Sequence, residues 1–369
     1  MWPDGVHLKL FVGSQSPRPV SLDVVEALRD LEVRCSDRER DGFQITFGVV
    51  KGSSMDHDVI ASGGFDPPAR IVAAIIDGSR TRVIFDGLVT HHQLGAGDRP
   101  GEALFTVTGE DLSVAMDLEE KNATYPGQSD STIVTRLLGA YARYGITPDV
   151  TSTPDVPPVT ERVPTQQGTD LDLIRHLASK RGFLFYIEPT AVGRSRAYWG
   201  PDRRAGAAQA ALTVGMGPAS NIDSIDVSFD ALAGEDPTGL VLPPGSRSAT
   251  RIGPAQGGGA SLASRAASPL RRTILRDTSK MSSGEASALA GARSSAQMDT
   301  LYATGELDVV RYGDILFPRR RVGVRGLGME QDGEYYVKSV THRIRRNEYR
   351  QRFVLVREGK GPRARRVSA

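Results

Sequence analysis

The sequence predicts a mainly β protein with a small α/β insertion between two β regions. Short apolar segments, alternating or continuous and separated by Gly, Asp and Pro, occupy residues 42–111 and again residues 296–358. Between them lie two segments with the apolar spacing of helices, each preceded by capping residues. The 369-residue chain has room for two or three compact units, and its 39% hydrophobic content is ordinary for a globular protein.

The first β region has four clear strand segments. Phe43–Phe47 alternates as a half-buried strand does, and Arg70–Ile76 is a more continuous apolar run. The turn residues Asp77-Gly78-Ser79 then predict a hairpin whose return strand is Arg82–Thr90. A further strand covers Glu102–Gly109, and several short strands of this kind favour a barrel or a sandwich.

The insertion, from about Asp117 to Gly200, begins with a helix. Ser129-Asp130 caps it, Gly145 ends it, and its apolar face consists of Ile133, Val134, Leu137, Leu138 and Tyr141. A connector with five prolines, Thr147–Pro164, is expected to be extended.

A second helix follows the connector. Thr169 to Asp172 resembles a capping box with Asp in place of Glu, and Gly182 stands where a left-handed C-cap would lie. Phe183–Ile187 is then expected to be a buried strand.

The third unit starts near Leu212 and contains the alternating segment Ile222–Phe229. Residues 231–281 are rich in Gly, Ser, Ala and Pro, and a loop of that length is expected to be functional or disordered. A helix is predicted over Ser283–Thr300, with Ser283 as its N-cap, followed by the C-terminal strands. Gly359–Ala369 has almost no apolar residues and is expected to be disordered on its own.

Several classes of protein are disfavoured by composition. No run of 18 apolar residues is present, and Met1-Trp2-Pro3-Asp4 does not resemble a secretory signal. The single cysteine, Cys35, cannot form an internal disulfide and is expected to be a small, half-buried apolar residue.

Charge is distributed unevenly along the chain. Residues 318–369 contain 15 Lys and Arg against 5 Asp and Glu, whereas the rest of the chain contains 31 against 39. Arginine forks bind carboxylates and phosphates, so contact with a partner and plain solvation explain the cluster equally well, with nucleic acid a weaker alternative. The candidate partner-contact cluster consists of Arg319, Arg320, Arg321, Arg325, Arg343, Arg345 and Arg346.

Catalytic and ligand-binding motifs are not evident. No zinc-protease, nucleophile-elbow, phosphate-loop or dinucleotide pattern occurs. We interpret Asp56-His57-Asp58 as an exposed polar segment and His91-His92 as surface residues, because adjacent side chains seldom bind one ion. Glu119-Glu120 would form an acid/base pair only with a carboxylate from elsewhere. We therefore predict no catalytic residue, no metal site and no cofactor.

The order of elements resembles bacteriophage baseplate hub proteins of the late-control-D family, which also forms the N-terminal part of VgrG spikes. The likeness extends over about Leu8 to Arg357 and rests on short motifs in order. These are Ile84–Thr90, Val107–Asp111, Ile133-Val134, Tyr144–Ile146, Gln167–Leu171, Leu177–Phe183, Tyr198–Pro201 and the final hairpin, from Tyr335-Tyr336-Val337 through His342 to Phe353 and Val356. The sequence departs from the family pattern at Phe65–Pro68 and at Arg311–Asp314, where turn chemistry is kept.

The resemblance implies two tail-tube-like β-barrels in tandem. The expected divisions are a first barrel (1–116), the α/β module (117–200), a second barrel (201–358) with an insertion at about 231–296, and a basic flexible tail (359–369). It assigns structural roles to motif residues, namely Phe85, Gly87, Gly109, Asp111, Asp170, Gly182, Phe183, Gly313, Asp314, Tyr335, Tyr336 and His342.

The function implied is that of a structural hub, not of an enzyme. Three chains would form a homotrimer that presents six barrels to a sixfold tail tube and three equivalent faces to a spike. VgrG-type chains continue beyond the final hairpin, so the resemblance implies a spike on a separate polypeptide. Other implied partners are the tape measure and baseplate wedge proteins, with DNA or cargo only passing through the pore.

The resemblance also implies assembly in the bacterial cytoplasm, in a contractile phage tail or a related injection system, with no part embedded in a membrane. Two alternatives stay open, a peptidoglycan hydrolase at the tail tip and the hub of a non-contractile tail.

Overall fold

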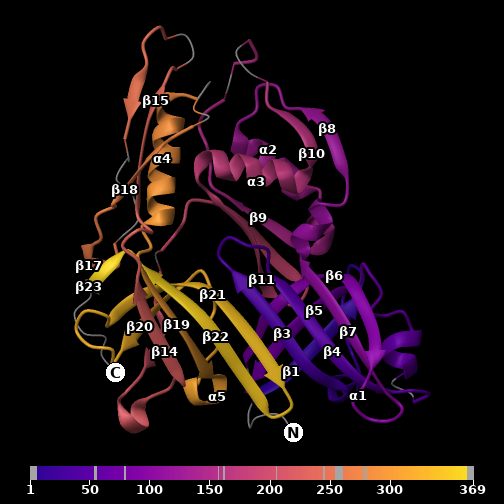
Figure 1. Cartoon of the computed structure of the whole chain (residues 1–369). Helices are drawn as coiled ribbons and strands as arrows, with labels where there is room; N and C mark the ends of the chain where they lie inside the picture. The colour runs from indigo at the N-terminus through magenta and orange to yellow at the C-terminus, as the bar shows by residue number, and fades with distance from the viewer. Residues whose placement is uncertain are drawn as a thin grey trace.

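A single large sheet organises the molecule (Figure 1). The computed structural model describes residues 6–53, 56–78, 80–156, 158–160, 163–204, 206–243, 246–253, 261–276, 278 and 281–363. In spatial order, the strands of the main path are β14 (Ser224–Phe229), β19 (Leu301–Asp308), β22 (Glu348–Arg357), β21 (Gly333–Arg345), β3 (Leu28–Ser36), β4 (Gly42–Val50), β7 (Glu102–Asp111), β6 (Arg80–Ala96), β5 (Arg70–Asp77), β1 (Val6–Gly13) and β2 (Arg18–Pro19). A branch adds β20 (Arg321–Arg325) and β13 (Gln209–Thr213) through the β20–β21 pair.

Strand β21 joins the two halves of this sheet. Its first residues pair with β20, from Gly333 to Tyr336, and its last residues pair with β3, from Ser339 to Arg345. Between these stretches, at Val337/Ser339, the pairing of β21 with β22 on its other side shifts register. We call the paired residues 339–345 of β21 and 30–36 of β3 the seam. One hydrophobic core lies beneath both halves and includes residues on either side of the seam.

The expected closed barrels are not confirmed. Among the described strands no sheet closes on itself, and the main path runs from β14 to β2 as an open ribbon. The physical reason is the length of β21, which pairs with β20 at its start and with β3 at its end. The sheet of the second half therefore continues into the first half. The mainly β class with helices is confirmed, and two tandem barrels stay a prediction.

The α/β module packs around its own core, separate from the core of the large sheet. Its helices α2 (Asp130–Gly139) and α3 (Asp170–Arg181) lie over two small sheets. One pairs β8 (Glu120–Thr124) with β10 (Thr165–Thr169), and the other orders β11 (Leu184–Ala191), β12 (Arg194–Gly200) and β9 (Ile146–Val150). The 3₁₀ turns η2 (Leu112–Met116) and η3 (Ala142–Tyr144) connect these elements.

Helix capping in the module follows the sequence closely. The Ser129 side chain accepts from Thr132 N, and Thr169 with Asp172 forms the reciprocal capping box. Gly182 ends α3 with φ +65°, as predicted. The prediction for Gly145 was wrong in detail, because α2 ends at Gly139 and Gly145 caps the following 3₁₀ turn. The start of the proline-rich connector forms β9.

The glycine-rich segment of the third unit is not one long loop. It contains β15 (Glu235–Val241), β16 (Thr250–Ile252), β17 (Ala263–Ala266) and β18 (Arg271–Ile274). Strands β16, β15 and β18 form a sheet, here called the arm sheet, which packs on α4 (Ser283–Gln297). The glycines 257–259 lie outside the described residues. The N-cap of α4 is Ser282 rather than Ser283, and it also forms a capping box, with Glu285.

The end of the chain differs from expectation as well. Gly359–Pro362 is strand β23, which pairs with β17, so the first part of the predicted tail is ordered by tertiary pairing. Residues 364–369 lie outside the described range. The remaining short elements are α1 (Leu22–Glu26), η1 (Asp56–Ala61), η4 (Gly217–Ala219) and α5 (Val309–Tyr312). None of the described helices is long and apolar enough to cross a membrane.

Candidate interaction surfaces

Most of the predicted motif residues lie inside the fold. Phe85 is buried against Phe43, with 4.8 Å between ring centroids, and Phe183 packs edge-on against Trp199 at the same distance. A Cβ at Gly87 or Gly109 would come within 2.2 Å of a backbone oxygen on the neighbouring strand. These residues allow the close approach of β4, β6 and β7.

Two motif aspartates organise buried hydrogen bonds. Asp111 accepts from Ser113 N and Asp41 N, which caps η2 and closes the end of β7. Asp170 accepts from Lys121 Nζ, Gln166 Nε2 and Tyr141 Oη at 2.7–2.8 Å. Burial opposes ionisation of Asp170, but these bonds outweigh it and lower its pKa.

The remaining motif residues belong to the second half of the sheet. Gly313, with φ +75°, ends α5, and Asp314 pairs with Arg82 of β6. Tyr335 and Tyr336 are both buried. The Arg357 guanidinium lies 4.4 Å over the ring of Tyr335, and the Arg204 guanidinium lies 4.8 Å over the ring of Tyr336.

His342 lies in the middle of the seam and is fully buried. Its Nδ1 is 2.8 Å from Tyr349 Oη and 3.2 Å from Gln351 Nε2, so both groups donate to it and the proton resides on Nε2. Burial lowers the pKa of His342 to about 3. The imidazole is therefore a neutral packing group of the second half, not a proton carrier at physiological pH.

The seven arginines of the predicted cluster do not form one patch. Arg321 pairs with Tyr336 of β21, and Arg345 lies nine residues further along the same strand. Nine residues of a strand span roughly 30 Å, so Arg321 and Arg345 are far apart. At the hairpin end, Arg343 and Arg345 both reach Asp30 of β3, and Arg346 is exposed. Near β20, Arg321 pairs with Glu334, and Arg325 donates to Thr213 Oγ1. The cluster as a contact for partners is not tested by these positions and stays a proposal.

Arg319 has a structural environment that the sequence did not reveal. Its backbone has φ +63°, and its buried guanidinium donates to Ser36 O and to Asp41 Oδ1. It also lies 4.2 Å over the ring of Tyr186. Arg319 therefore joins the loop before β20 to the β3–β4 turn and to the α/β module.

A cavity of about 350 Å³ lies beside Arg319, where the three parts of the molecule meet. Its acidic lining residues are Asp41, Glu188 and Asp314. Burial raises the pKa of Asp41 to about 6. Burial also opposes ionisation of Glu188, but hydrogen bonding and charge from Arg196 lower its pKa. Each of the three carboxylates accepts from an arginine, so their ordinary role is to hold the junction together.

A second buried ion pair, between Arg70 and Asp86, was not predicted from the sequence. Arg70 and Asp86 form two hydrogen bonds of 2.7 Å, and both side chains are almost fully buried. Asp86 also accepts from Ser195 Oγ of β12, which ties the first half to the module. The only signal in the sequence was a cation at the head of an apolar run, Arg70–Ile76.

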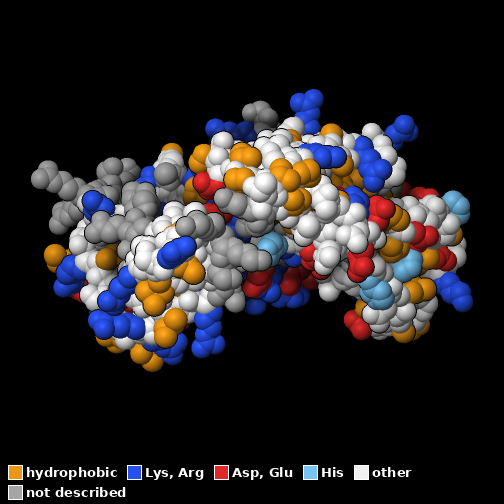
Figure 2. Space-filling model, turned by 90° about the horizontal axis from the view of Figure 1, so that it is seen from above, with side chains coloured by type: hydrophobic (Ala, Val, Ile, Leu, Met, Phe, Trp, Pro, Cys, Tyr) orange, Lys and Arg blue, Asp and Glu red, His pale blue; other side chains and the backbone are white. Residues whose placement is uncertain are grey.

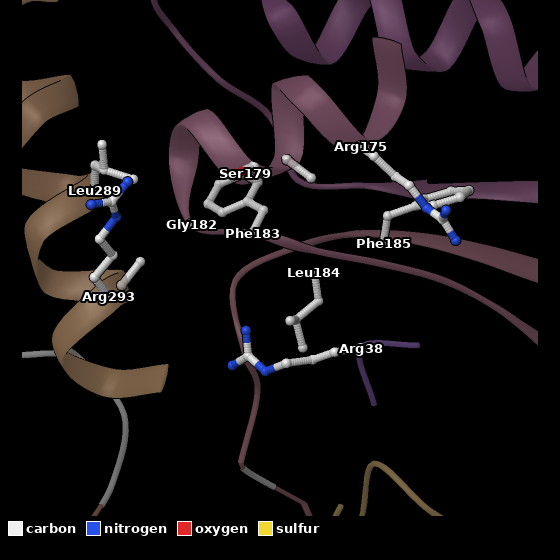
Figure 3. Close-up of a pocket in the computed structure, with 11 residues that line it drawn as sticks. Arg38, Arg175, Ser179, Gly182, Phe183, Leu184, Phe185, Leu289 and Arg293 are labelled. Atoms are coloured by element: carbon white, nitrogen blue, oxygen red, sulfur yellow. The ribbon is translucent and has the colours of Figure 1, made fainter. Parts of the chain in front are cut away.

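A cleft of about 270 Å³ opens between α3, β11 and α4 (Figure 3). Its wall is apolar, including Phe183, Leu184 and Leu289, and its lining contains no carboxylate. Arg38, Arg175 and Arg293 surround it from three different elements, as Figure 3 shows. An opening of this kind suits an acidic segment with an apolar side chain rather than a neutral small molecule.

Neither histidine motif builds a metal site. His57 Nδ1 is 3.4 Å from its neighbour Asp58, and His92 Nδ1 is 3.3 Å from Asp66, with all four side chains largely exposed. Within the part of the chain that the structure describes, no group of three or more His, Cys, Asp or Glu could hold an ion. Cys35 is buried at the seam, deeper than the half-buried position predicted.

One family model matches part of the chain. Residues 45–203 match the family model described as the Alg8 N-terminal domain, a segment of less than half of the chain. No curated protein matches the sequence.

Solved structures match over nearly the whole chain. A tail protein from Neisseria meningitidis MC58 is 13% identical, with a TM-score of 0.63, over 95% of this chain and 96% of that one. The 43 kDa tail protein of prophage MuSo2 from Shewanella oneidensis is 13% identical, with a TM-score of 0.62, over 95% and 98%. A type VI secretion component from E. coli, described as structurally similar to the T4 tail proteins gp27 and gp5, is 14% identical, with a TM-score of 0.55, over 93% and 78%. The chain therefore has the fold that these phage tail proteins share with a component of the type VI secretion system.

Proposed function

We propose that this protein is the structural hub of a contractile phage tail or of a related injection system. In this role it joins a sixfold tail tube to a threefold spike as a homotrimer. The observation that carries the proposal is the likeness to phage tail proteins over 95% of the chain, from both β halves through the module between them. A match of that extent involves the relative arrangement of all three parts and not one common β motif.

The organisation of the large sheet supports a scaffold. Two β halves share one core, and the Arg319–Asp41 pair joins them. The module is fastened through Tyr186, which lies under Arg319, and through Ser195, which donates to the buried Asp86. A chain built in this way presents two β units in a fixed mutual orientation. In a trimer, six such units would surround a pore and face a sixfold tube.

A peptidoglycan hydrolase at the tail tip is the alternative that one observation favours. The junction cavity contains one carboxyl with a raised pKa, Asp41, and one with a lowered pKa, Glu188, as an acid and a nucleophile would require. Against it, Asp41 is only 3% exposed and accepts from Ser36 N and from Arg319. A carboxyl held in this way is engaged in stabilising the loop.

The first experiment measures the mass of the purified full-length chain by light scattering over a range of concentrations. Candidate tube and spike proteins from the same genome are then added in turn. The expected result is a particle near three times 39.7 kDa that binds both. A chain that stays monomeric with either protein present, and binds neither, would overturn the hub.

A zymogram on peptidoglycan separates the hydrolase from the hub. No clearing is expected from the wild-type chain. Clearing that is lost in Glu188→Gln would replace the proposal with the enzyme. A gene for a tail sheath next to the gene for this protein would favour a contractile tail over the non-contractile alternative.

A further inference from the structure

Among the residues that the structure describes, the arm sheet has one covered face and one uncovered face. On the covered side, Val241, Ile252 and Leu275 pack against α4. The opposite side carries exposed large apolar residues, with Leu240 at 63%, Leu242 at 53% and Ile274 at 73% exposure. An antiparallel or mixed sheet with a free face ordinarily carries polar residues there, so an apolar free face indicates a contact surface.

Strand register shows that these residues share the outer face. Leu240 is paired with Arg251, and Thr238 with Ile274. Arg272 precedes Ile274 by two residues, so it faces the same way. Its side chain is 86% exposed and lies 3.9 Å from Asp236, its partner across the β15–β18 pair. The outer face of the arm sheet is therefore an apolar strip, Leu240, Leu242 and Ile274, between two arginines, Arg251 and Arg272.

A surface of complementary character lies on the α/β module. Leu118 is 67% exposed and is followed by Glu119 and Glu120, both exposed. Among the described contacts, neither glutamate forms an ion pair. We call Leu118, Glu119 and Glu120 the acidic corner. It leads into β8, whose side of the β8–β10 sheet away from the module core carries polar residues such as Asn122 and Gln167.

The two surfaces lie at opposite ends of the molecule. In Figure 1 the arm sheet and α4 stand at the left of the upper half, with α3 and α2 between them and β8 at the right. Figure 2 shows basic and hydrophobic side chains gathered on the lobe at the left, with more acidic side chains toward the other end. One molecule thus carries a basic apolar face and an acidic apolar corner that cannot touch each other.

We propose that the arm sheet of one copy binds the acidic corner of a second copy, head to tail. This inference rests on the proposed trimeric hub and names the contact that closes its ring. Because the two surfaces differ, the contact is heterologous, and repeating it generates a ring whenever the rotation closes. Arg251 and Arg272 would meet Glu119 and Glu120, while Leu118 would insert among Leu240, Leu242 and Ile274.

Reversing the charges on either surface tests this contact, and reversing both together tests whether the two surfaces meet. The arm variant is Arg251→Glu with Arg272→Glu, and the corner variant is Glu119→Arg with Glu120→Arg. Each is expected to raise the concentration needed for half-assembly about tenfold or more, because like charges then face each other. The chain with all four substitutions is expected to recover assembly. A matched control, Arg18→Glu with Lys51→Glu, reverses two exposed charges far from both surfaces and is expected to assemble normally.

The outcomes separate this inference from the hub itself. If the wild-type chain forms a trimer, alone or with spike protein, and neither variant changes it, the contact is wrong and the hub stands. If the arm variant keeps its trimer but loses the tube protein, the arm docks on another partner and the contact is again wrong. If the wild-type chain never assembles and binds neither neighbour, both proposals fail. Circular dichroism melting checks that each variant is folded, and loss of folding in the arm variant leaves the corner variant as the decisive test.

Discussion

At the scale of single residues, buried charge is concentrated where the two halves and the module meet. Asp37 and Asp41 follow the seam strand β3 within five residues, and Arg319 N donates to Val337 O next to the seam. All three side chains are almost fully buried. Asp41 is stabilised by two donors, whereas Asp37 Oδ1 has no hydrogen-bond partner among the described residues. The chain tolerates an unsatisfied carboxylate at a position that joins three parts of the fold, at a cost in stability.

Asp37→Asn is expected to stabilise the protein at pH 8. Burial raises the pKa of Asp37 to about 6, against attraction from Arg38 and Lys338. Between about pH 4 and pH 6 the folded state binds more protons here than the unfolded state does, so this carboxyl lowers the free energy of unfolding as pH rises. Asparagine removes the ionised form, and the gain at pH 8 is at most about 3 kcal/mol, shrinking to nothing near pH 4.

Urea unfolding at pH 4, 6 and 8 measures this effect. Asp226→Asn, at an exposed position on β14, is the matched control and is expected to show little change at any pH. A loss of stability in Asp37→Asn at pH 8 would mean that the ionised carboxylate is needed by Arg38 or Arg204.

At the scale of elements, helix α4 is held against α3 through one glycine. Gly182 ends α3 with φ +65°, and a Cβ there would lie 1.8 Å from Ala292 Cβ of α4. Position 182 therefore requires glycine for two separate reasons, the left-handed backbone and the close contact with Ala292. Lys180 and Arg181 add charge contacts from the same turn, and Lys180 donates to Glu285 at 2.9 Å. This turn of α3 therefore sets where α4 and the arm sheet stand.

Gly182→Ala is expected to destabilise the chain by more than the roughly 1 kcal/mol that a left-handed alanine costs, because the methyl group also overlaps Ala292. Ala292→Gly should lose about 1 kcal/mol of helix propensity by itself. In the double variant the overlap is removed, so the combined loss should be smaller than the sum. Chemical denaturation of the three variants measures the coupling. Strict additivity would show that α4 moves aside without resistance.

At the scale of the whole molecule, we expect the two β halves to unfold as one cooperative unit. Their common core runs beneath the seam, whereas the α/β module has a separate core. A continuous sheet with a continuous core has no internal boundary at which one half can unfold and leave the other intact. That rigidity is what a hub needs if it is to present two β units to a tube in one orientation.

Val340→Ala at the seam is expected to destabilise both halves equally, by roughly 2 kcal/mol. Val340 is fully buried and is paired with Cys35 on one side and Phe353 on the other. Native-state hydrogen exchange should show the same loss of protection for slow amides of β4 and β22. Val134→Ala, equally buried in the module core, is the matched control and should act first on α2 and α3. Loss of protection in β22 alone would mean that the halves unfold independently.

The sequence by itself determined the local elements and their order. Alternation located the strands at residues 43–47 and 102–109, and hydroxyl caps with three-residue spacing located α2 and α3, because these signals depend on contacts within a few residues. Composition failed where pairing partners are distant. Gly359–Pro362 pairs with β17, nearly a hundred residues earlier, and β15 pairs with β18 across more than thirty residues, although these strands have weak propensity.

Only the tertiary structure decided which arginines are free and which are engaged. Residues 319–346 read as one basic cluster, yet Arg319 is buried beside Asp41, and Arg345 lies roughly 30 Å from Arg321 at the other end of β21. The same holds for the open sheet, since whether β21 pairs with β20 or with β3 depends on its length and its register shift. Pairing and burial are long-range properties, and a linear pattern of charge and hydropathy does not contain them.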